Sequence, residues 1–265
     1  MTGTALPAPP RERLRNSATD ALTMTGRSIR LSRRDAETLL MSVVLPLLLM
    51  ALFVYVFGGA IRTGTHYVDY VVPGIILLCA GYGAATTAMA VAADMSGGMV
   101  DRLRSMPIRS SAVLLGHVTA SVARNALSTA VVIAAAVAMG FRPDATVPEW
   151  LLATGLLLLY VLALSWLAAW LGVLASGVES ASALSFTMLF LPYLSSAFVP
   201  TDTMPAFLRP IAAHQPITPV IETVRGLLTG TPIGSSGWQA AAWSGGLLVA
   251  ACCAAVQGFR RRTAR

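Results

Sequence analysis

The chain has 265 residues, of which 55% are hydrophobic and 12% are charged, and its formal net charge is +7. The charged share is about half that of a typical soluble domain, so the composition excludes an ordinary soluble protein and indicates a membrane protein. All nineteen basic residues are arginine, which excludes a conventional ATP-binding P-loop, because that loop needs a lysine for the phosphates.

Residues 1–37 precede the first apolar run and are predicted to form a cytosolic tail and an interfacial helix. Residues 1–17 lack an apolar run and are expected to be disordered. Residues 20–37 mix apolar residues with several arginines, as a helix lying on an anionic leaflet would, although a solvated lead-in to the first span has the same composition. No signal peptide is expected, because the polar lead before Leu39 is too long.

Six apolar runs follow, long enough to cross a hydrocarbon core of about 30 Å at about 1.5 Å per residue. They are Leu39–Gly58, Tyr70–Ala93, Ala112–Phe141, Trp150–Leu174, Ser180–Val199 and Trp238–Phe259. We therefore predict an all-α membrane domain of six transmembrane helices over residues 38–259, with a basic cytosolic tail at 260–265. The third run exceeds one crossing, so its cytosolic end should project and Arg124 should snorkel outward.

The arginines are distributed unevenly between the two sides that six spans define. One side carries fourteen of them: Arg11, Arg13, Arg15, Arg27, Arg30, Arg33, Arg34, Arg102, Arg104, Arg109, Arg260, Arg261, Arg262 and Arg265. The other side carries four: Arg62, Arg142, Arg209 and Arg225. Because cytoplasmic loops are enriched in arginine, both termini are predicted to be cytoplasmic in a multi-pass cell-membrane protein. This placement explains the net charge, so we expect membrane lipid and no nucleic acid as a partner.

A polar stretch between the second and third runs, D-M-S-G-G-M-V-D-R-L-R-S-M-P-I from Asp94 to Ile108, is the main candidate for a functional contact. Gly97 and Gly98 break the preceding helix and Pro107 restricts the residue before it, so only a short helix, Met99–Ser105, fits between them. Its apolar face comprises Met99, Leu103 and, just past its end, Met106, and its charged residues are Asp101, Arg102 and Arg104. Such a two-faced helix suits docking of a partner, although an ordinary polar loop between spans has a similar composition.

The stretch from Pro200 to Gly237 holds six of the fifteen prolines and therefore cannot be one continuous helix. Two short helices fit, Met204–Ala213 and Ile217–Leu228, with Gly230 ending the second. The apolar face of the second consists of Val220, Ile221, Val224, Leu227 and Leu228, and its charged residues, Glu222 and Arg225, are spaced to pair on the other face. We predict an external helical hairpin that dips into the outer leaflet or caps a cavity, or else a structured loop with no role in transport.

No arrangement typical of an enzyme active site occurs in the sequence. The histidines His66, His117 and His214 are scattered and are predicted to be polar surface or interface residues, while Cys79, Cys252 and Cys253 lie in apolar runs as small hydrophobes. No carboxylate pair or metal-ligand cluster is found. Apart from Arg124, ionisable residues are missing from the depth of the spans, which argues against an ion-driven mechanism. We expect the chain not to be an enzyme and to bind no metal or cofactor.

The sequence resembles the type-2 permease subunits of ATP-binding-cassette (ABC) exporters, and most closely the daunorubicin-resistance branch of antibiotic and multidrug exporters. Four motifs carry the likeness: Y-V-V-P-G at Tyr70–Gly74, the polar stretch at Asp94–Ile108, F-V-P-T-D-T-M-P at Phe198–Pro205, and Q-P-I-T-P-V-I-E-T-V-R-G-L-L-T-G at Gln215–Gly230. With six spans in the right order, they cover nearly the whole chain after residue 20.

The resemblance implies that Met99–Pro107 looks like the coupling helix that docks on a separate nucleotide-binding subunit. The residues implied in coupling are Asp94, Gly98, Met99, Asp101, Arg102, Leu103, Arg104, Met106 and Pro107. It also implies two ATPase subunits, which bind the ATP and magnesium, and a second permease subunit, either identical or a close paralogue.

The resemblance implies a substrate path between the two permeases, lined by the second and fifth spans, with Thr86, Thr87, Met89, Phe186, Phe190 and Tyr193. Without the resemblance, the helical spacing of the three aromatic residues favours core packing. The hairpin residues singled out by the likeness are Pro205, Pro216, Glu222, Arg225 and Gly226.

The expected function is export of a hydrophobic drug, antibiotic or lipid-like substrate, driven by ATP hydrolysis on the partner. Two alternatives remain open from the sequence. The first is an ion-driven secondary transporter or channel, and the second is a membrane assembly or enzyme subunit without transport. A neighbouring reading frame for a cassette ATPase would favour the exporter.

Overall fold

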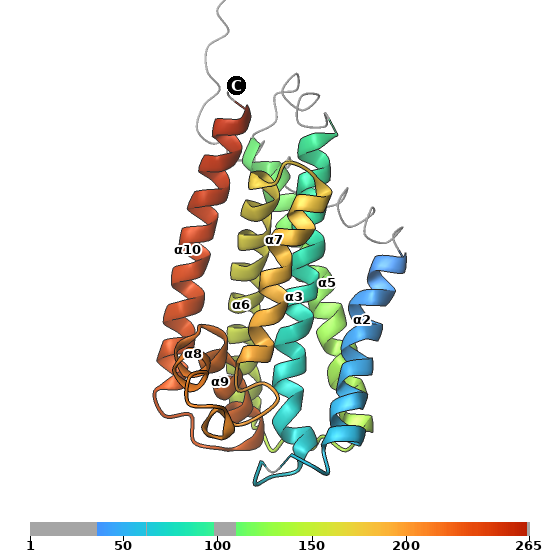
Figure 1. The fold of residues 1–265 in the computed structure, drawn as a ribbon, viewed down its shortest axis with the longest axis vertical. Helices are drawn as coiled ribbons and strands as arrows, with labels where there is room; N and C mark the ends of the chain where they lie inside the picture. Colours follow the sequence, from blue (N-terminus) through green and yellow to red (C-terminus); the bar gives the residue numbers. More distant parts are fainter. Residues whose placement is uncertain (1–35, 62, 98–109, 264–265) are drawn as a thin grey trace, which may run out of the picture.

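The computed structural model describes residues 36–61, 63–97 and 110–263, which form an up-and-down bundle of helices (Figure 1). The longer helices are α2 (Ala36–Ala51), α3 (Tyr67–Ser96), α5 (Ser110–Ala138), α6 (Val147–Leu174), α7 (Val178–Phe190) and α10 (Ser236–Thr263). The shorter elements are η1 (Leu52–Phe57), η2 (Leu191–Leu194), η3 (Thr201–Thr203), α8 (Arg209–His214) and α9 (Ile217–Thr229). The described residues contain no strand, and the predicted all-α class is confirmed.

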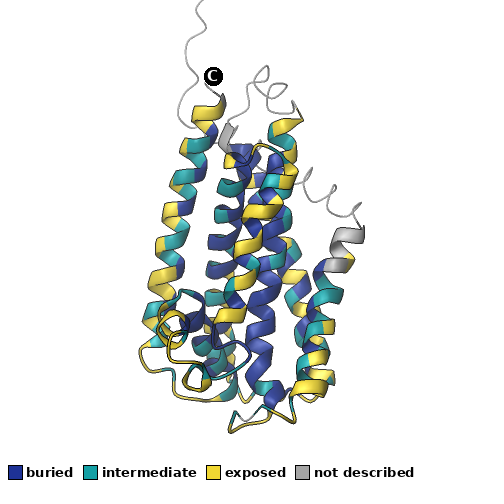
Figure 2. Cartoon of the chain, in the orientation of Figure 1, coloured by how far each residue is buried: buried dark blue, intermediate teal, exposed yellow. Residues whose placement is uncertain are grey.

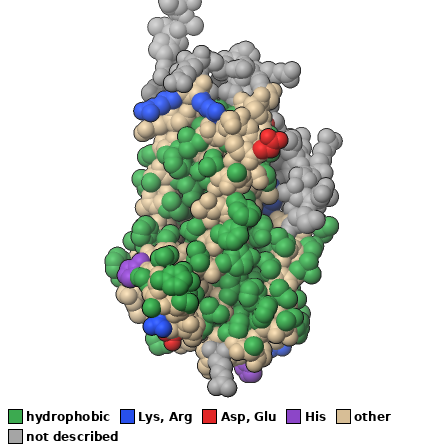
Figure 3. Space-filling model, in the orientation of Figure 1, with side chains coloured by type: hydrophobic (Ala, Val, Ile, Leu, Met, Phe, Trp, Pro, Cys, Tyr) green, Lys and Arg blue, Asp and Glu red, His purple; other side chains and the backbone are tan. Residues whose placement is uncertain are grey.

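Among the described residues, four helices are long and apolar enough to cross a membrane, namely Tyr67–Ser96, Ala112–Ala138, Val147–Leu174 and Ser236–Arg262. Two shorter apolar helices, Ser42–Phe57 and Val178–Leu194, occupy the positions of the first and fifth predicted spans. Hydrophobic side chains cover the middle of the viewed face, and the charged side chains visible on it lie towards its two ends (Figure 3). This distribution is the one expected of a protein whose middle lies in hydrocarbon.

Helix α3 is the centre of the bundle, whereas α10 lies at its edge. In α3, 78% of the most apolar stretch is buried, against 22% in α10 (Figure 2). Small residues allow the close contacts: a Cβ on Gly83 would lie 2.3 Å from Asn125 Oδ1 of α5. Likewise, a Cβ on Gly172 of α6 would lie 2.5 Å from the Ala88 carbonyl oxygen. Glycine is required at such crossings because any side chain would push the helices apart.

The fifth predicted span, Ser180–Val199, is wrong over its last five residues. Helix α7 ends at Phe190, and a 3-10 turn, η2, follows. The physical reason is Pro192, which has no N–H to donate to the α-helical ladder and whose ring opposes the preceding turn. The chain then leaves the helix axis, so the residues after 194 form a loop rather than membrane-spanning helix.

Other predicted boundaries shift by a few residues for identifiable reasons. Helix α6 begins at Val147, earlier than predicted, because Glu149 Oε2 accepts hydrogen bonds from the Thr146 N–H and Oγ1, both at 2.7 Å, in a capping box. Helix α5 ends at Ala138, before Gly140, whose φ of 104° is incompatible with continuing the helix. The first predicted hairpin helix, Met204–Ala213, is also wrong at its start, because α8 begins only at Arg209.

The end of α3, the start of α5 and the end of α10 lie towards one end of the bundle, and the start of α2 points towards that same end (Figure 1). The α8–α9 pair lies at the opposite end (Figure 1). The helix ends that border the arginine-rich segments are therefore on one side of the molecule. The predicted interfacial helix at 20–37 lies almost entirely outside the described residues.

Candidate functional site

The predicted docking segment lies outside the described residues from Gly98 to Arg109, and its short helix stays a prediction. The helix ends on both sides of it are described. Helix α3 closes at Gly97, whose N–H donates to the Ala93 carbonyl at 2.8 Å, and Ser96 Oγ donates to the Ala92 carbonyl at 2.9 Å. The Gly97 bond continues the helical backbone pattern through the last turn, and the Ser96 hydroxyl adds a side-chain bond in the same turn, so α3 reaches the segment with a well-defined end.

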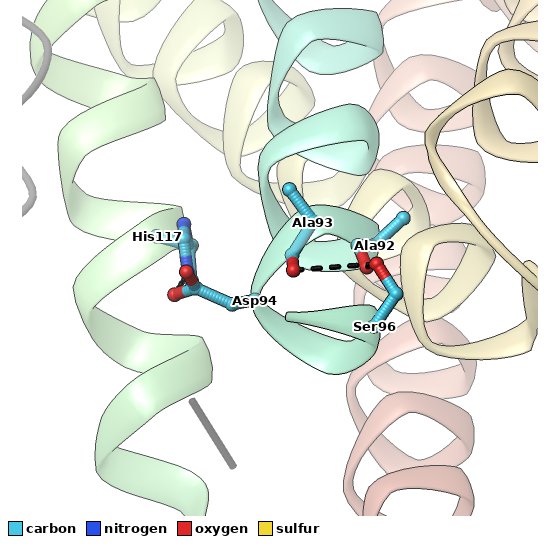
Figure 4. A network of polar contacts seen from close by, with 5 residues as sticks. All are labelled: Ala92, Ala93, Asp94, Ser96 and His117. Carbon is cyan, nitrogen blue, oxygen red and sulfur yellow. Dashed lines mark hydrogen bonds and ion pairs between the residues drawn. The ribbon is translucent and has the colours of Figure 1, made fainter. Parts of the chain in front are cut away.

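A side-chain contact joins the two helices that enter and leave the segment. His117 Nε2, on α5, lies 3.0 Å from Asp94 Oδ2, on the last turns of α3 (Figure 4). The two side chains are 12% and 20% exposed, respectively. A carboxylate accepting from an imidazole in such a partly buried place restricts the relative motion of the helices that carry it. Asp94, one of the predicted coupling residues, thus joins α3 to α5 close to the points where the segment leaves one helix and enters the other.

From the sequence, His117 was predicted only to be a polar surface or interface residue, with no partner. A signal existed, because Asp94 directly follows the second predicted span and His117 lies in the first turns of the third. Two antiparallel helices joined by that stretch bring such positions to the same level. Predicting the contact also requires knowing which faces of the two helices meet, and only the tertiary packing shows this.

The predicted aromatic stripe is exposed on the outer surface of the single chain. Phe186 is 58% exposed, Phe190 51% and Tyr193 36%. Their rings form successive contacts, with centroid distances of 4.8 Å between Phe186 and Phe190 and 6.1 Å between Phe190 and Tyr193. Figure 2 shows exposed residues along the viewed face of α7. In a membrane bundle, aromatic groups left uncovered in this way face either lipid or another protein subunit.

The stripe continues through residues that the sequence did not single out. Tyr193 stacks on Phe198 with a centroid distance of 5.2 Å, and Phe198 stacks on Phe53 at 4.3 Å. Phe53 in turn contacts Phe57 of η1 at 5.5 Å. A chain of six aromatic rings therefore runs from α7 across the loop after η2 to the end of the first apolar helix. We call Phe186, Phe190, Tyr193, Phe198, Phe53 and Phe57 the aromatic ladder.

The predicted path residues of the second span face partly into the bundle. Thr87 is 1% exposed, and both Thr86 and Thr87 donate their hydroxyl groups to the Gly83 carbonyl at 2.9 Å. Met89 packs against the small cluster of Ala92, Ala175 and Ala181. Thr87 is thus a helix-packing residue in this chain, and it is not on the same surface as the aromatic ladder.

Arg124 does not snorkel outward as predicted. Its Nη2 donates to Thr87 Oγ1 at 3.1 Å, across the α3–α5 contact. The reason is local: the neighbouring faces of these helices offer hydroxyl and carbonyl acceptors, including Thr87, Ser121 and the Gly83 carbonyl. A guanidinium within reach of such acceptors is better satisfied between the helices than beside hydrocarbon.

The hairpin is fastened to the bundle by Arg225, which points inward. Its Nε donates to the Tyr70 carbonyl at 3.1 Å and its Nη2 to the Ser196 carbonyl at 2.7 Å. The guanidinium carbon also lies 3.7 Å from the centroid of the Tyr70 ring. Burial lowers the pKa of Arg225 from its ordinary value, but an arginine keeps its charge at any physiological pH. One side chain thus joins α9, the start of α3 and the loop after η2.

The predicted pairing of Glu222 with Arg225 is wrong. Within the described part of the chain no ion pair joins them, and Glu222 Oε2 instead accepts from Ser236 Oγ, at the start of α10, at 2.9 Å. Gly226 allows the return loop to approach, because a Cβ there would lie 2.6 Å from Ile233. Pro216 precedes α9, and the Pro205 carbonyl accepts the Leu208 N–H at 2.9 Å.

The apolar face of α9 is confirmed. The five predicted residues Val220, Ile221, Val224, Leu227 and Leu228 are all buried. Gly230 ends the helix with φ of 70°, the left-handed conformation that glycine adopts without strain. Helix α9 is therefore packed against the bundle through this face. In the described ranges, no group of three His, Cys, Asp or Glu residues could hold a metal ion.

Comparisons with known proteins agree with this architecture. The sequence profile of the ABC-2 type transporter family matches residues 19–229. The chain is 29% identical over 225 residues, covering 84% of it and 77% of the relative, to the daunorubicin resistance ABC transporter permease protein DrrB1 of Streptomyces coeruleorubidus. It is 27% identical over 248 residues, covering 91% of it and 88% of the relative, to the probable doxorubicin resistance ABC transporter permease protein DrrC of Mycobacterium tuberculosis.

Proposed function

This chain belongs to the ABC-2 type transporter family, and we propose that it is the permease subunit of an exporter that moves an apolar, drug-like or lipid-like substrate out of the cell. The relatives are named as daunorubicin and doxorubicin resistance permeases. The exposed rings of the aromatic ladder, Phe186, Phe190 and Tyr193, could stack on an apolar substrate, and they are the structural observation that best supports a substrate of this kind.

The energy comes from ATP hydrolysed on a separate subunit, as the family implies. The chain itself contains no lysine and hence no P-loop lysine. We propose that two ATPase subunits and two permease subunits assemble, with ATP and magnesium held entirely by the ATPases. The two shorter apolar helices, Ser42–Phe57 and Val178–Leu194, complete six crossings in this arrangement, and the arginine-rich ends of the bundle face the cytoplasm.

The contact with the ATPase is proposed to be the segment between α3 and α5. Met99, Leu103 and Met106 would enter a groove on the partner, with Asp101, Arg102 and Arg104 at its rim. The Asp94–His117 contact supports this assignment, because it couples the two helix ends that would receive the movement of the segment. A push on the segment would then reach α3, the central helix of the bundle.

Replacing Leu103 by Asp tests this proposal. Burying an unpaired charge in a protein contact costs several kcal/mol, so Leu103→Asp should leave the permease inserted but abolish co-purification of the ATPase and substrate-stimulated hydrolysis. The conservative variant Leu103→Met should retain both. Phe207→Asp, at an exposed position of the opposite end, is the matched control and should retain ATPase binding. Normal complex formation and export by Leu103→Asp would refute the assignment.

A further inference from the structure

A groove of about 380 Å³ runs between the C-terminal ends of α6 and α10. Trp170, Val173 and Leu174 of α6 form one wall, and Ala254, Gly258 and Arg261 of α10 form the other. The inner part is apolar and the outer part carries positive charge. None of the residues that line it is acidic. In Figure 3, arginine side chains near the end of α10 lie directly above a largely apolar surface.

Two adjacent arginines in this groove have different roles. Arg262 Nη1 donates to the carbonyls of Val173 and Ala175, both at 2.8 Å, and so caps the end of α6 and fixes the two helix ends together. Arg261 is exposed and makes no hydrogen bond or ion pair with the described part of the chain, so its charge at the mouth of the groove is available to a ligand.

The position of the groove along α10 corresponds to the edge of the hydrocarbon core. Trp238, 67% exposed, stands at the other end of this helix, and the rise from Trp238 to Arg261 is about 35 Å at about 1.5 Å per residue. A tryptophan at one interface and arginines at the other are typical of a helix that crosses a bilayer. The Ala254 level lies about 10 Å deeper than Arg261. The charged mouth is therefore at headgroup level and the apolar part reaches the acyl region.

We propose that this groove binds an anionic phospholipid, with its phosphate on Arg261 and the start of an acyl chain between Trp170 and Ala254. A lipid matches both ends of the groove at once, whereas a free anion matches only the charged mouth. Anionic lipids are enriched in cytoplasmic leaflets, so the assignment rests on the proposed cytoplasmic position of this end. It does not rest on the identity of the exported substrate.

Lipid retention by the purified permease tests the site directly. The protein would be transferred from nanodiscs containing equal amounts of phosphatidylglycerol and phosphatidylcholine to native mass spectrometry, and the retained lipids counted. Arg261→Gln should lower phosphatidylglycerol retention about fivefold, the equivalent of about 1 kcal/mol for one arginine at a membrane surface. The adjacent variant Arg260→Gln is the matched control, because it removes the same charge from a position that does not line the groove, and it should change retention less than twofold.

A second variant fills the groove without changing charge. A Cβ on Gly258 would lie 3.4 Å from Val173 Cγ1 and 3.9 Å from Trp170 Cδ1, so it fits, and Gly258→Leu would place its side chain between the walls. Gly258→Leu should reduce retention as strongly as Arg261→Gln. Should it fail to fold, as judged by its thermal melt, Arg261→Gln and its control decide the matter.

Four outcomes would overturn the proposal. The first is equal retention of the two lipids, and the second is equal loss in the Arg260→Gln and Arg261→Gln variants. The third is full competition by millimolar inorganic phosphate, which would assign the site to a free anion. The fourth is loss of ATPase co-purification in Arg261→Gln with unchanged lipid retention, which would make the groove a protein contact. Loss of export with normal lipid retention in Leu103→Asp would leave this site intact, so the two proposals fail separately.

Discussion

Replacing Arg225 by methionine should detach the hairpin from the bundle. The native side chain donates to two backbone carbonyls, those of Tyr70 and Ser196, and lies over the Tyr70 ring. Hydrogen bonds to charged groups contribute about 1.5–3 kcal/mol each and a cation–π contact about 0.5–2 kcal/mol. Methionine keeps the apolar stem but leaves both carbonyls without their donor. After allowing for overlap of these contributions, we expect Arg225→Met to lower the free energy of unfolding by about 3–5 kcal/mol.

Reversible unfolding of the purified permease in mixed micelles, titrated with SDS, measures this loss. Arg225→Lys should lose about half as much, because an ammonium group has no planar fork to reach two carbonyls. Glu222→Gln is the control for the ion pair with Arg225 that the sequence predicted, because it removes the negative charge but keeps an acceptor for Ser236. It should change the free energy of unfolding by less than about 1 kcal/mol. A loss below about 1 kcal/mol in Arg225→Met, or an equal loss in Glu222→Gln, would refute the inward role of Arg225.

Three further predictions concern transport and topology. Phe190→Ala interrupts the aromatic ladder and should change the relative export of apolar substrates while protein level holds; loss of folded protein with unchanged selectivity would instead indicate core packing. His117→Ala removes the contact with Asp94 and should lower export while the ATPase still co-purifies; unchanged export would remove that contact from the coupling route. A cysteine at position 104 should resist impermeant reagents added to intact cells, and labelling from outside would reverse the proposed topology.

The sequence by itself determined the class of protein and most of its helices. Long uncharged runs can satisfy their backbone groups in hydrocarbon only as helices, so composition alone leads to a helical membrane bundle. The short helix α9 was also predictable, because its apolar period selects one buried face and Gly230 supplies the left-handed end that stops it. These are local properties, readable from residues that are neighbours in sequence.

Much of the candidate site depended on the packing of α3. Two polar contacts, His117 with Asp94 and Arg124 with Thr87, join α3 to α5, and the sequence pattern of one helix does not indicate which face its neighbour covers. The aromatic stripe was identified from its spacing, but its continuation through Phe198 to Phe53 crosses between separate segments of the chain.

Arg225 shows most clearly why the sequence alone could not predict side-chain partners. Its spacing from Glu222 favours an ion pair along one helix, which is worth only about 0.3–0.5 kcal/mol at a surface. The tertiary structure offers two carbonyls and an aromatic ring instead, and the sum of these contacts is larger. The sequence determined which residues could pair locally. Only the folded bundle decided which partner each side chain contacts, because that depends on distances between segments far apart in the chain.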